Sequence, residues 1–367
     1  MTIEEHAVLQ EGPPISGSRP HDLPAPLPPP RGAVTVALLH YLRQDPEQVE
    51  VDLSRLTWSG ATADAATDDD LQLAMWLVYE LHYRGLEGVD DGWEWHLGLV
   101  EAMQEWEGLL EDALRLVTGS EGATVDPAEV PEQLFALAAQ DGGPSLSKAL
   151  MRDADPAQFC EFLIHRSMYH LKEADPHTWV IPRLSGPVKA AMITIQADEY
   201  GLGVTEAMHA QLFRALMNSW ELNSIYAHYL ARVPGVTLLA SNLISMFGLH
   251  RRFRGALVGH LALFEMTSSA PNARYARGHR RLGGSEAAAR FFDEHVVADA
   301  VHEQIAAYEL AGGLASAEPR LAADILFGAR CAAFADAAFA DWVLPRWAAG
   351  GSSLLADVSR PYLAVAS

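Results

Sequence analysis

The sequence has few cysteines and little positive charge, and each shortage excludes a class of protein. Its 367 residues include only Cys160 and Cys331, so neither a disulfide framework nor a four-thiolate zinc site can form. Lys and Arg number 26 against 48 Asp and Glu, which gives a formal net charge of -22 at pH 7. This charge disfavours the phosphate backbone of nucleic acids and anionic membrane surfaces. We therefore expect a small-molecule substrate as the partner, with neither nucleic acid nor membrane, and the sequence leaves a homodimer open.

Long apolar runs are absent as well. The longest, "GVTLLASNLISMFGL" at 235–249, is shorter than the ~20 residues of a membrane helix and contains Ser and Asn, so it predicts a buried helix. The first residues, "MTIEEHAVLQEGPPISG", are acidic and lack the apolar centre of a secretory signal. Together with the low cysteine content, these features predict a cytoplasmic protein.

Long alternating runs of β-branched residues are also missing, which predicts an all-α fold. The segment "DDDLQLAMWLVYELHYRGL" starts with acids and continues with apolar residues three and four apart, a helical pattern that recurs along the chain. The stretch "RPHDLPAPLPPPRG" cannot continue a helix because of its prolines. We predict a Pro-rich disordered arm over 1–31, an N-terminal helical part over 32–140, a helical core over 141–350 and a C-terminal tail over 351–367. The two helical parts should pack as one unit.

The segment "EHVVADAVHE" at 294–303 concentrates metal-binding side chains on one helix. His295, Asp299 and His302 have the spacing i, i+4, i+7, which places them within ~60° of one another on a helix face. Val and Ala surround them, so burial would be costly unless one partner satisfied all three. The mixture of imidazole and carboxylate indicates iron or manganese. A solvated helix face with incidental histidines is the alternative interpretation.

A site for two metal ions needs further ligands from other helices. Four candidates stand out: Glu173, Glu199, His209 and Glu265. Glu265 follows Leu-Ala-Leu-Phe in an apolar helix, where an unpaired carboxylate is unfavourable.

A second ligand scheme rests on a repeated spacing. Glu206 precedes His209 by three residues, as Asp299 precedes His302. Ferritin-like di-iron bundles use this carboxylate-x-x-His spacing twice. In that scheme Glu206 is a ligand and His295 is not.

The motifs "KEADPHTW", "QADEYGLG", "MHAQLF", "RGALVGHLALFEMTSS" and "RFFDEHVVADAVHE" together resemble the haem-oxygenase-like di-iron oxidases and oxygenases, also called iron-containing redox enzymes. The resemblance extends from "LVYELHYRGLEGVDDGWEW" to "DWVLPRW", which is most of the chain. It implies a haem-oxygenase-like helical bundle with an N-terminal helical extension.

The resemblance also implies a set of metal-binding and catalytic residues: Glu173, Glu199, His209, Glu265, His295, Asp299 and His302. One iron would bind Glu173 and His209. The other would bind His295 and His302. Glu265 and Asp299 would complete or bridge the two, and His170, His177 and Glu206 are reserve ligands.

The implied reaction uses two Fe(II) ions per chain and O2 as co-substrate, through a peroxo-di-iron(III) species. The substrate would be a small amino-acid-like molecule with amine and carboxylate groups. Glu199 matches an extra carboxylate of the N-oxygenating branch, which favours N-oxygenation. Desaturation and C–C cleavage are the alternatives within the same family.

Two readings outside this chemistry stay open. Cys160 beside Glu161 would be the nucleophile of a metal-free thiaminase-like hydrolase, and a non-enzymatic iron-binding helical protein would bind metal without turnover.

The sequence offers two groups of side chains for the substrate pocket. Arg183 and the arginines at 251, 252 and 254 would anchor a carboxylate, unless they form a surface patch. Trp179, Tyr200 and Trp220 would line the pocket, unless they pack in the core.

Overall fold

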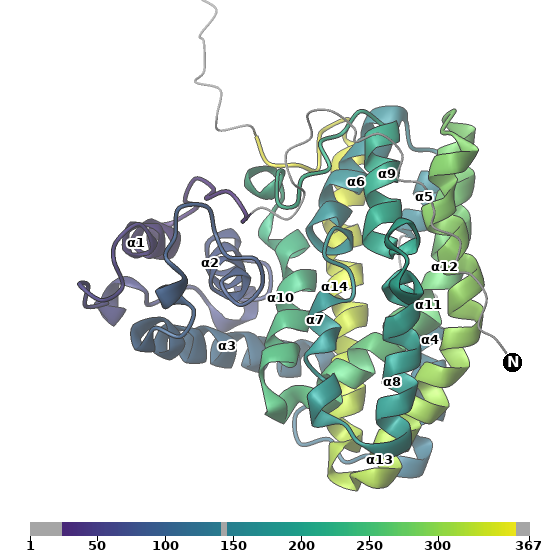
Figure 1. The fold of residues 1–367 in the computed structure, drawn as a ribbon, viewed down its shortest axis with the longest axis horizontal. Helices are drawn as coiled ribbons and strands as arrows, with labels where there is room; N and C mark the ends of the chain where they lie inside the picture. The colour runs from purple at the N-terminus through teal and green to yellow at the C-terminus, as the bar shows by residue number, and fades with distance from the viewer. Residues whose placement is uncertain (1–23, 141–144, 357–367) are drawn as a thin grey trace, which may run out of the picture.

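The computed structural model describes residues 24–140 and 145–356, and no strand occurs among them (Figure 1). This confirms the predicted all-α class. The α-helices are α1 (Ala33–Leu42), α2 (Asp69–Glu80), α3 (Leu97–Thr118), α4 (Val130–Ala138), α5 (Leu146–Arg152), α6 (Pro156–His170), α7 (Asp175–Thr178), α8 (Gly186–Glu199), α9 (His209–Ser219), α10 (Gly235–Leu249), α11 (Arg254–Arg281), α12 (Glu286–Gln304), α13 (Gly313–Ala317) and α14 (Ala322–Ala348).

Shorter helical segments connect them. A π-helix, Ile305–Gly312, directly follows α12. The 3₁₀ turns are Leu53–Arg55, Thr62–Asp64, Asp91–Trp93, Pro127–Glu129, Ile181–Arg183, Gly201–Gly203, Thr205–Ala207, Leu230–Arg232, Arg251–Phe253 and Pro319–Leu321.

The core is a bundle around the long helix α11, which packs against both α12 and α14 (Figure 1). Helices α11 and α14 approach closely because each has a glycine at the crossing. A Cβ at Gly259 would overlap the carbonyl of Ile325, and one at Gly328 would overlap the carbonyl of Ala256. Any larger residue would force the helices apart, so these glycines fix the spacing of the two helices that border the interior.

The N-terminal helices form a side layer on this bundle. Helices α1 to α3 lie together at one side, with α2 packed on α10 and α3 on α14 (Figure 1). Helix α10 is the predicted buried helix, and the structure confirms it with identical bounds. Helix α4 falls within the predicted N-terminal part, yet it packs on α11 and α14 and so lies with the core bundle.

The Pro-rich segment is ordered over its described part, residues 24–31, which corrects the expectation of disorder there. Ala25 is buried, and its N–H donates to the carbonyl of Gly85 at 3.1 Å. The Arg31 guanidinium donates to the carbonyls of Leu230 and Val233 at 2.8 and 2.6 Å. Proline excludes a helix, but an extended chain can still pack and form such bonds. Residues 1–23 lie outside the described residues.

A buried ion pair ties the side layer to the core. Lys172, just after α6, lies 3.0 Å (Nζ to Oε2) from Glu80 at the end of α2, and their side chains are 2% and 0% exposed. The Tyr226 hydroxyl donates to the same oxygen at 2.8 Å, and the Lys172 ammonium lies 4.0 Å from the centre of the Tyr83 ring. Because Lys172 precedes Glu173, this contact also fixes the backbone at one of the predicted ligands.

Replacing Lys172 by Met should destabilise the protein by about 3–5 kcal/mol, because Glu80 would keep a buried charge without its partner. The midpoint of urea unfolding measures this. The double variant Lys172→Met/Glu80→Gln should recover most of the loss. As a control, Arg290→Ala breaks an exposed pair with Glu294 and should cost at most about 1 kcal/mol. Equal losses of unfolding free energy for Lys172→Met and Arg290→Ala would contradict the stabilising role of the buried Lys172–Glu80 pair.

Candidate metal centre

Glu173 is positioned by the abrupt end of α6. The helix starts with a capping box between Asp155 and Gln158 and ends at His170. Ala174 then takes a φ of 73°, a left-handed conformation that is uncommon for a residue with a Cβ. The Gln196 side chain donates to the Ala174 carbonyl at 3.0 Å and holds this turn. The turn directs Glu173 into the interior, where it is 5% exposed.

Glu199 and His209 are brought together by the loop "YGLG" after α8. Glu199 is the last residue of α8, and His209 is the first residue of α9. Gly201 has a φ of 60°, and a Cβ there would lie 2.5 Å from the backbone of Ala207 and Met208. Only glycine permits this close return of the chain. As a result the His209 Nδ1 lies 2.9 Å from a Glu199 carboxylate oxygen.

Helix α12 supplies two histidines. His295 donates from Nδ1 to the carbonyl of Phe291 at 2.7 Å, which fixes the tautomer and directs Nε2 toward Glu173, at 3.6 Å. A bond from imidazole to a backbone carbonyl is common among metal-binding histidines. His302 contacts Glu265 of α11 through Nδ1 at 3.1 Å and Asp198 of α8 through Nε2 at 2.8 Å.

Among the described residues these side chains form two groups whose possible ligand atoms all lie within 4.8 Å of one another. The first group is Glu173, Glu199, His209 and His295, and the second is Glu199, Glu265 and His302. Glu199 belongs to both groups and therefore lies between them. Six of the seven predicted site residues are thus brought together in a buried cluster.

Three expectations about individual residues need revision or stay open. His295 groups with Glu173 and His209 and not with His302, because the two histidines lie two turns apart on α12, about 10 Å along the axis. Glu206 is exposed and is absent from both groups, so the ferritin-like scheme is not supported. The side chain of Asp299 lies outside the described residues.

The electrostatics of the cluster follow from burial and pairing. Burial by itself raises the pKa of Glu173, but the His170 and His295 imidazoles outweigh it and hold this pKa well below its usual range. Burial lowers the pKa of His209, yet the Glu199 carboxylate has the larger effect and the net shift is upward. Glu173 therefore stays ionised, as a cation ligand must.

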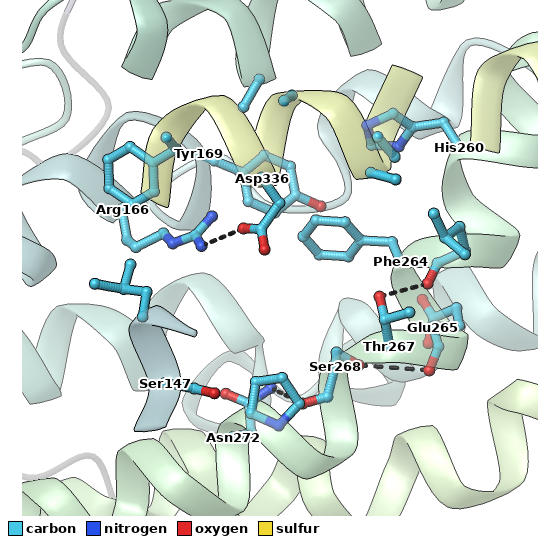
Figure 2. Close-up of a pocket in the computed structure, with 18 of the residues that line it drawn as sticks. Ser147, Arg166, Tyr169, His260, Phe264, Glu265, Thr267, Ser268, Asn272 and Asp336 are labelled. Atoms are coloured by element: carbon cyan, nitrogen blue, oxygen red, sulfur yellow. Dashed lines mark hydrogen bonds and ion pairs between the residues drawn. The ribbon is translucent and has the colours of Figure 1, made fainter. Parts of the chain in front are cut away.

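A cavity of about 920 Å³ adjoins the cluster, and Glu173, Glu199, Glu265 and His295 form part of its wall. Figure 2 shows Glu265 and His260 toward one end and Arg166 and Ser147 toward the other. The cavity also exposes the aromatic rings of Tyr169, Phe264 and Phe291. A small organic molecule can therefore reach the cluster.

The predicted substrate anchors do not line this cavity. The Arg183 guanidinium donates to the carbonyls at the end of α10, Arg252 pairs with Glu111, and Arg254 pairs with Glu318; Arg251 is exposed. Arg183 therefore caps α10, Arg252 forms an ion pair at the surface, and the buried Arg254 side chain forms one with Glu318.

The predicted aromatic residues also lie outside the cavity wall. The Tyr200 hydroxyl donates to Asp175, the Trp220 indole donates to His279, and Trp179 packs against Tyr83. All three are half-buried, and Trp220 packs against the core, which was the alternative interpretation.

Sequence reasoning missed two residues. Asp198 contacts His302, and only its position next to Glu199 could have suggested it. His260 lies one and a half turns before Glu265 on α11, and its Nδ1 lies 3.4 Å from Nε2 of His177, another buried cavity residue. Burial holds the pKa of both imidazoles below the usual value.

Comparison with known proteins places the cluster in a family. Residues 160–337 match the family described as iron-containing redox enzymes. This segment belongs to that family. It contains all seven predicted site residues. The match supports an iron-using oxidoreductase and agrees with the predicted haem-oxygenase-like bundle.

One relative has a name that states its activity. Over 164 residues the chain is 26% identical to nitrosourea synthase from Streptomyces achromogenes subsp. streptozoticus. The alignment covers 44% of this chain and 34% of that protein, so the chain spans about a third of the length of the curated relative it matches.

The residues present fit iron. Three imidazoles and three carboxylates form the donor set of the described cluster, a mixture typical of non-haem iron sites. Glu173 Oε2 is buried and receives no hydrogen bond from the described residues, so an acceptor atom points into the cluster without a donor. A buried carboxylate oxygen of this kind is satisfied by a cation.

The affinity of the cluster for Fe(II) should increase as the pH rises. Burial lowers the pKa of His302, but hydrogen bonds to Glu265 and Asp198 outweigh it and raise the pKa to about 9. Below this pH a proton on His302 competes with the metal, so the affinity for Fe(II) should rise by up to about tenfold per pH unit. Anaerobic chelator competition between pH 6.5 and 8 measures it.

The variant Asp198→Asn is the control for this effect. It removes one carboxylate that stabilises the protonated imidazole, so the pH dependence should become weaker. An affinity that does not change with pH in the unmodified protein would contradict the role of His302.

Proposed function

We propose that this protein is a non-haem oxidoreductase that binds two iron ions per chain and oxidises a small amine-containing substrate with O2. The observation that carries the proposal is the pair of buried ligand groups that share Glu199 beside a substrate-sized cavity. The family match supports iron and redox chemistry.

The metal-ligand residues form two ion-binding positions. Glu173, His209 and His295 would hold one ion. Glu265 and His302 would hold the other, with Glu199 between the two. Two bound ferrous ions would supply the electrons for O2 reduction that protein side chains lack.

The chain itself excludes water and orients the ligands. The six residues of the cluster are 1–8% exposed, so bulk solvent has little access to the reacting groups. The carbonyl of Phe291 keeps Nε2 of His295 as the metal-binding nitrogen. His177 and His260 are held neutral in the cavity wall, where a neutral imidazole can donate one hydrogen bond and accept another.

N-oxygenation is the reaction that the comparison supports most. The relative with 26% identity is named for making a nitrosourea, whose nitroso group contains an oxidised nitrogen. Glu199, the carboxylate expected in the N-oxygenating branch, lies at the centre of the cluster. Desaturation and C–C cleavage give different products and are separated by the experiment below.

The metal-free hydrolase has no support in the cavity. Cys160 is not among its lining residues, and burial raises the pKa of this thiol. The Glu161 carboxylate accepts hydrogen bonds from Trp347, Ser352 and Ser353 and so points to the C-terminal segment.

Anaerobic titration should show two Fe(II) equivalents per chain. Glu199→Ala should reduce the binding of both ions, because both groups lose the shared carboxylate. Glu206→Ala, an exposed glutamate seven residues further along, should retain two equivalents and is the matched control. One equivalent in the unmodified protein, or two in Glu199→Ala, would reject the dinuclear site.

Exposure of the iron-loaded protein to O2 with candidate amines should give a product one oxygen atom heavier, with the atom on nitrogen, detected by mass spectrometry with 18O2. His302→Ala should abolish it because one ion is lost. O2 consumption without an oxidised organic product would instead indicate an iron-binding protein without substrate turnover.

A further inference from the structure

Asp198 lies outside both ligand groups and yet contacts one of the ligands. Its Oδ2 atom lies 2.8 Å from Nε2 of His302. The His302 side chain is 1% exposed, whereas the Asp198 side chain is 39% exposed, so the carboxylate approaches this ligand from the solvent side of the cluster. The proposed reaction gives this contact no role.

Two adjacent acids at the end of α8 explain how the contact forms. Asp198 and Glu199 are the last two residues of this helix, and successive side chains on a helix point about 100° apart. Glu199 enters the cluster and is 8% exposed, while Asp198 reaches His302 on α12. One dipeptide therefore supplies a carboxylate inside the cluster and a second carboxylate behind one of its histidines.

The two ring nitrogens of His302 face two different carboxylates. Nδ1 lies 3.1 Å from Oε2 of Glu265, and Nε2 faces Asp198. Glu265 belongs to the same ligand group as Glu199 and His302, whereas Asp198 does not. Because the two ring nitrogens point in divergent directions, a cation held by this group would meet Nδ1 of His302.

The contact with Asp198 selects the tautomer that such a cation needs. A neutral imidazole has one N–H group and one nitrogen with a free lone pair, and only the lone pair binds a metal. An ionised carboxylate only accepts hydrogen bonds, so Nε2 of His302 is the donor to Asp198. The free lone pair is therefore on Nδ1.

His295 has the opposite arrangement on the same helix. Its Nδ1 donates to the carbonyl of Phe291 at 2.7 Å, which leaves Nε2 as the metal-binding nitrogen. The two acceptors also differ in charge, because the Phe291 carbonyl is neutral and the Asp198 carboxylate is anionic. An anionic acceptor raises the basicity of a metal-binding imidazole. His302 is therefore the more strongly donating of these two ligands.

We propose that Asp198 is a positioning residue that holds His302 as an Nδ1 ligand and strengthens its bond to the second ion. Helix α12 would then bind the two ions through opposite ring nitrogens, Nε2 of His295 and Nδ1 of His302. This inference rests on the proposed function, since it concerns the ligands of the same two ions.

Nitrogen NMR of the zinc-loaded protein tests the ligand nitrogen directly. Zn(II) is diamagnetic and binds imidazole and carboxylate ligands, so it reports the bound nitrogen without O2 chemistry. In protein labelled with 15N-histidine, 1H–15N correlations within each ring distinguish the metal-bound nitrogen from the N–H group. The His302 signals are those absent from His302→Gln. We expect Nδ1 as the bound nitrogen of His302, and a bound Nε2 would overturn the proposal.

Substitutions of Asp198 test the strength of the bond to the metal. In the iron-loaded protein, Asp198→Ala should make one of the two Fe(II) ions dissociate at least about tenfold faster into excess chelator under anaerobic conditions. Asp198→Asn keeps an uncharged acceptor oxygen, so its effect should be smaller. Asp293→Asn, at an exposed carboxylate of α12 that pairs with Arg280, is the matched control and should leave both rates unchanged.

Two dissociation results would overturn the proposal. One is a rate in Asp198→Ala that equals that of the unmodified protein, and the other is an equal acceleration for both ions, which would indicate a general loosening of the cluster. Uptake of fewer than two Fe(II) ions by the unmodified protein would instead reject the proposed function. The NMR experiment needs neither iron nor O2, so its result is independent of that outcome.

Discussion

Burial of like charges is the constraint on which the interior depends. Glu173, Glu199 and Glu265 lie close together in a helical bundle, each at most 8% exposed. Desolvation of a single carboxylate costs several kcal/mol, and neighbouring carboxylates repel one another. Hydrogen bonds from His170 and His302 offset part of this free energy. Positive metal charge would offset the rest, which explains how a bundle of apolar helices can bury three carboxylates side by side.

Irregular backbone surrounds the cluster on several sides, as expected where the side chains must converge. Helix α6 ends before Glu173 and turns at Ala174 in a left-handed conformation, while α8 ends at Glu199 and returns through Gly201. A π-helix begins three residues after His302, and such segments concentrate at functional sites. Regular helices therefore supply the walls, and their interruptions aim the ligands inward.

Much of the fold was predictable because it depends on local pattern. Apolar spacing predicted the helices, and an acid in an apolar helix indicated Glu265. The partner of His295 was not predictable, since it depends on how far α12 is displaced along α6, which only tertiary packing sets. The same holds for Asp198, whose contact with His302 requires α12 beside α8, and for the ordered segment 24–31, where proline excludes a helix but permits packing.

The central claim is that six buried side chains hold two iron ions with Glu199 between them. Anomalous diffraction at the iron edge, from crystals grown anaerobically with Fe(II), tests it most directly. Two peaks are predicted, one beside Glu173, His209 and His295 and the other beside Glu265 and His302. A single peak, or peaks away from these side chains, would contradict the account.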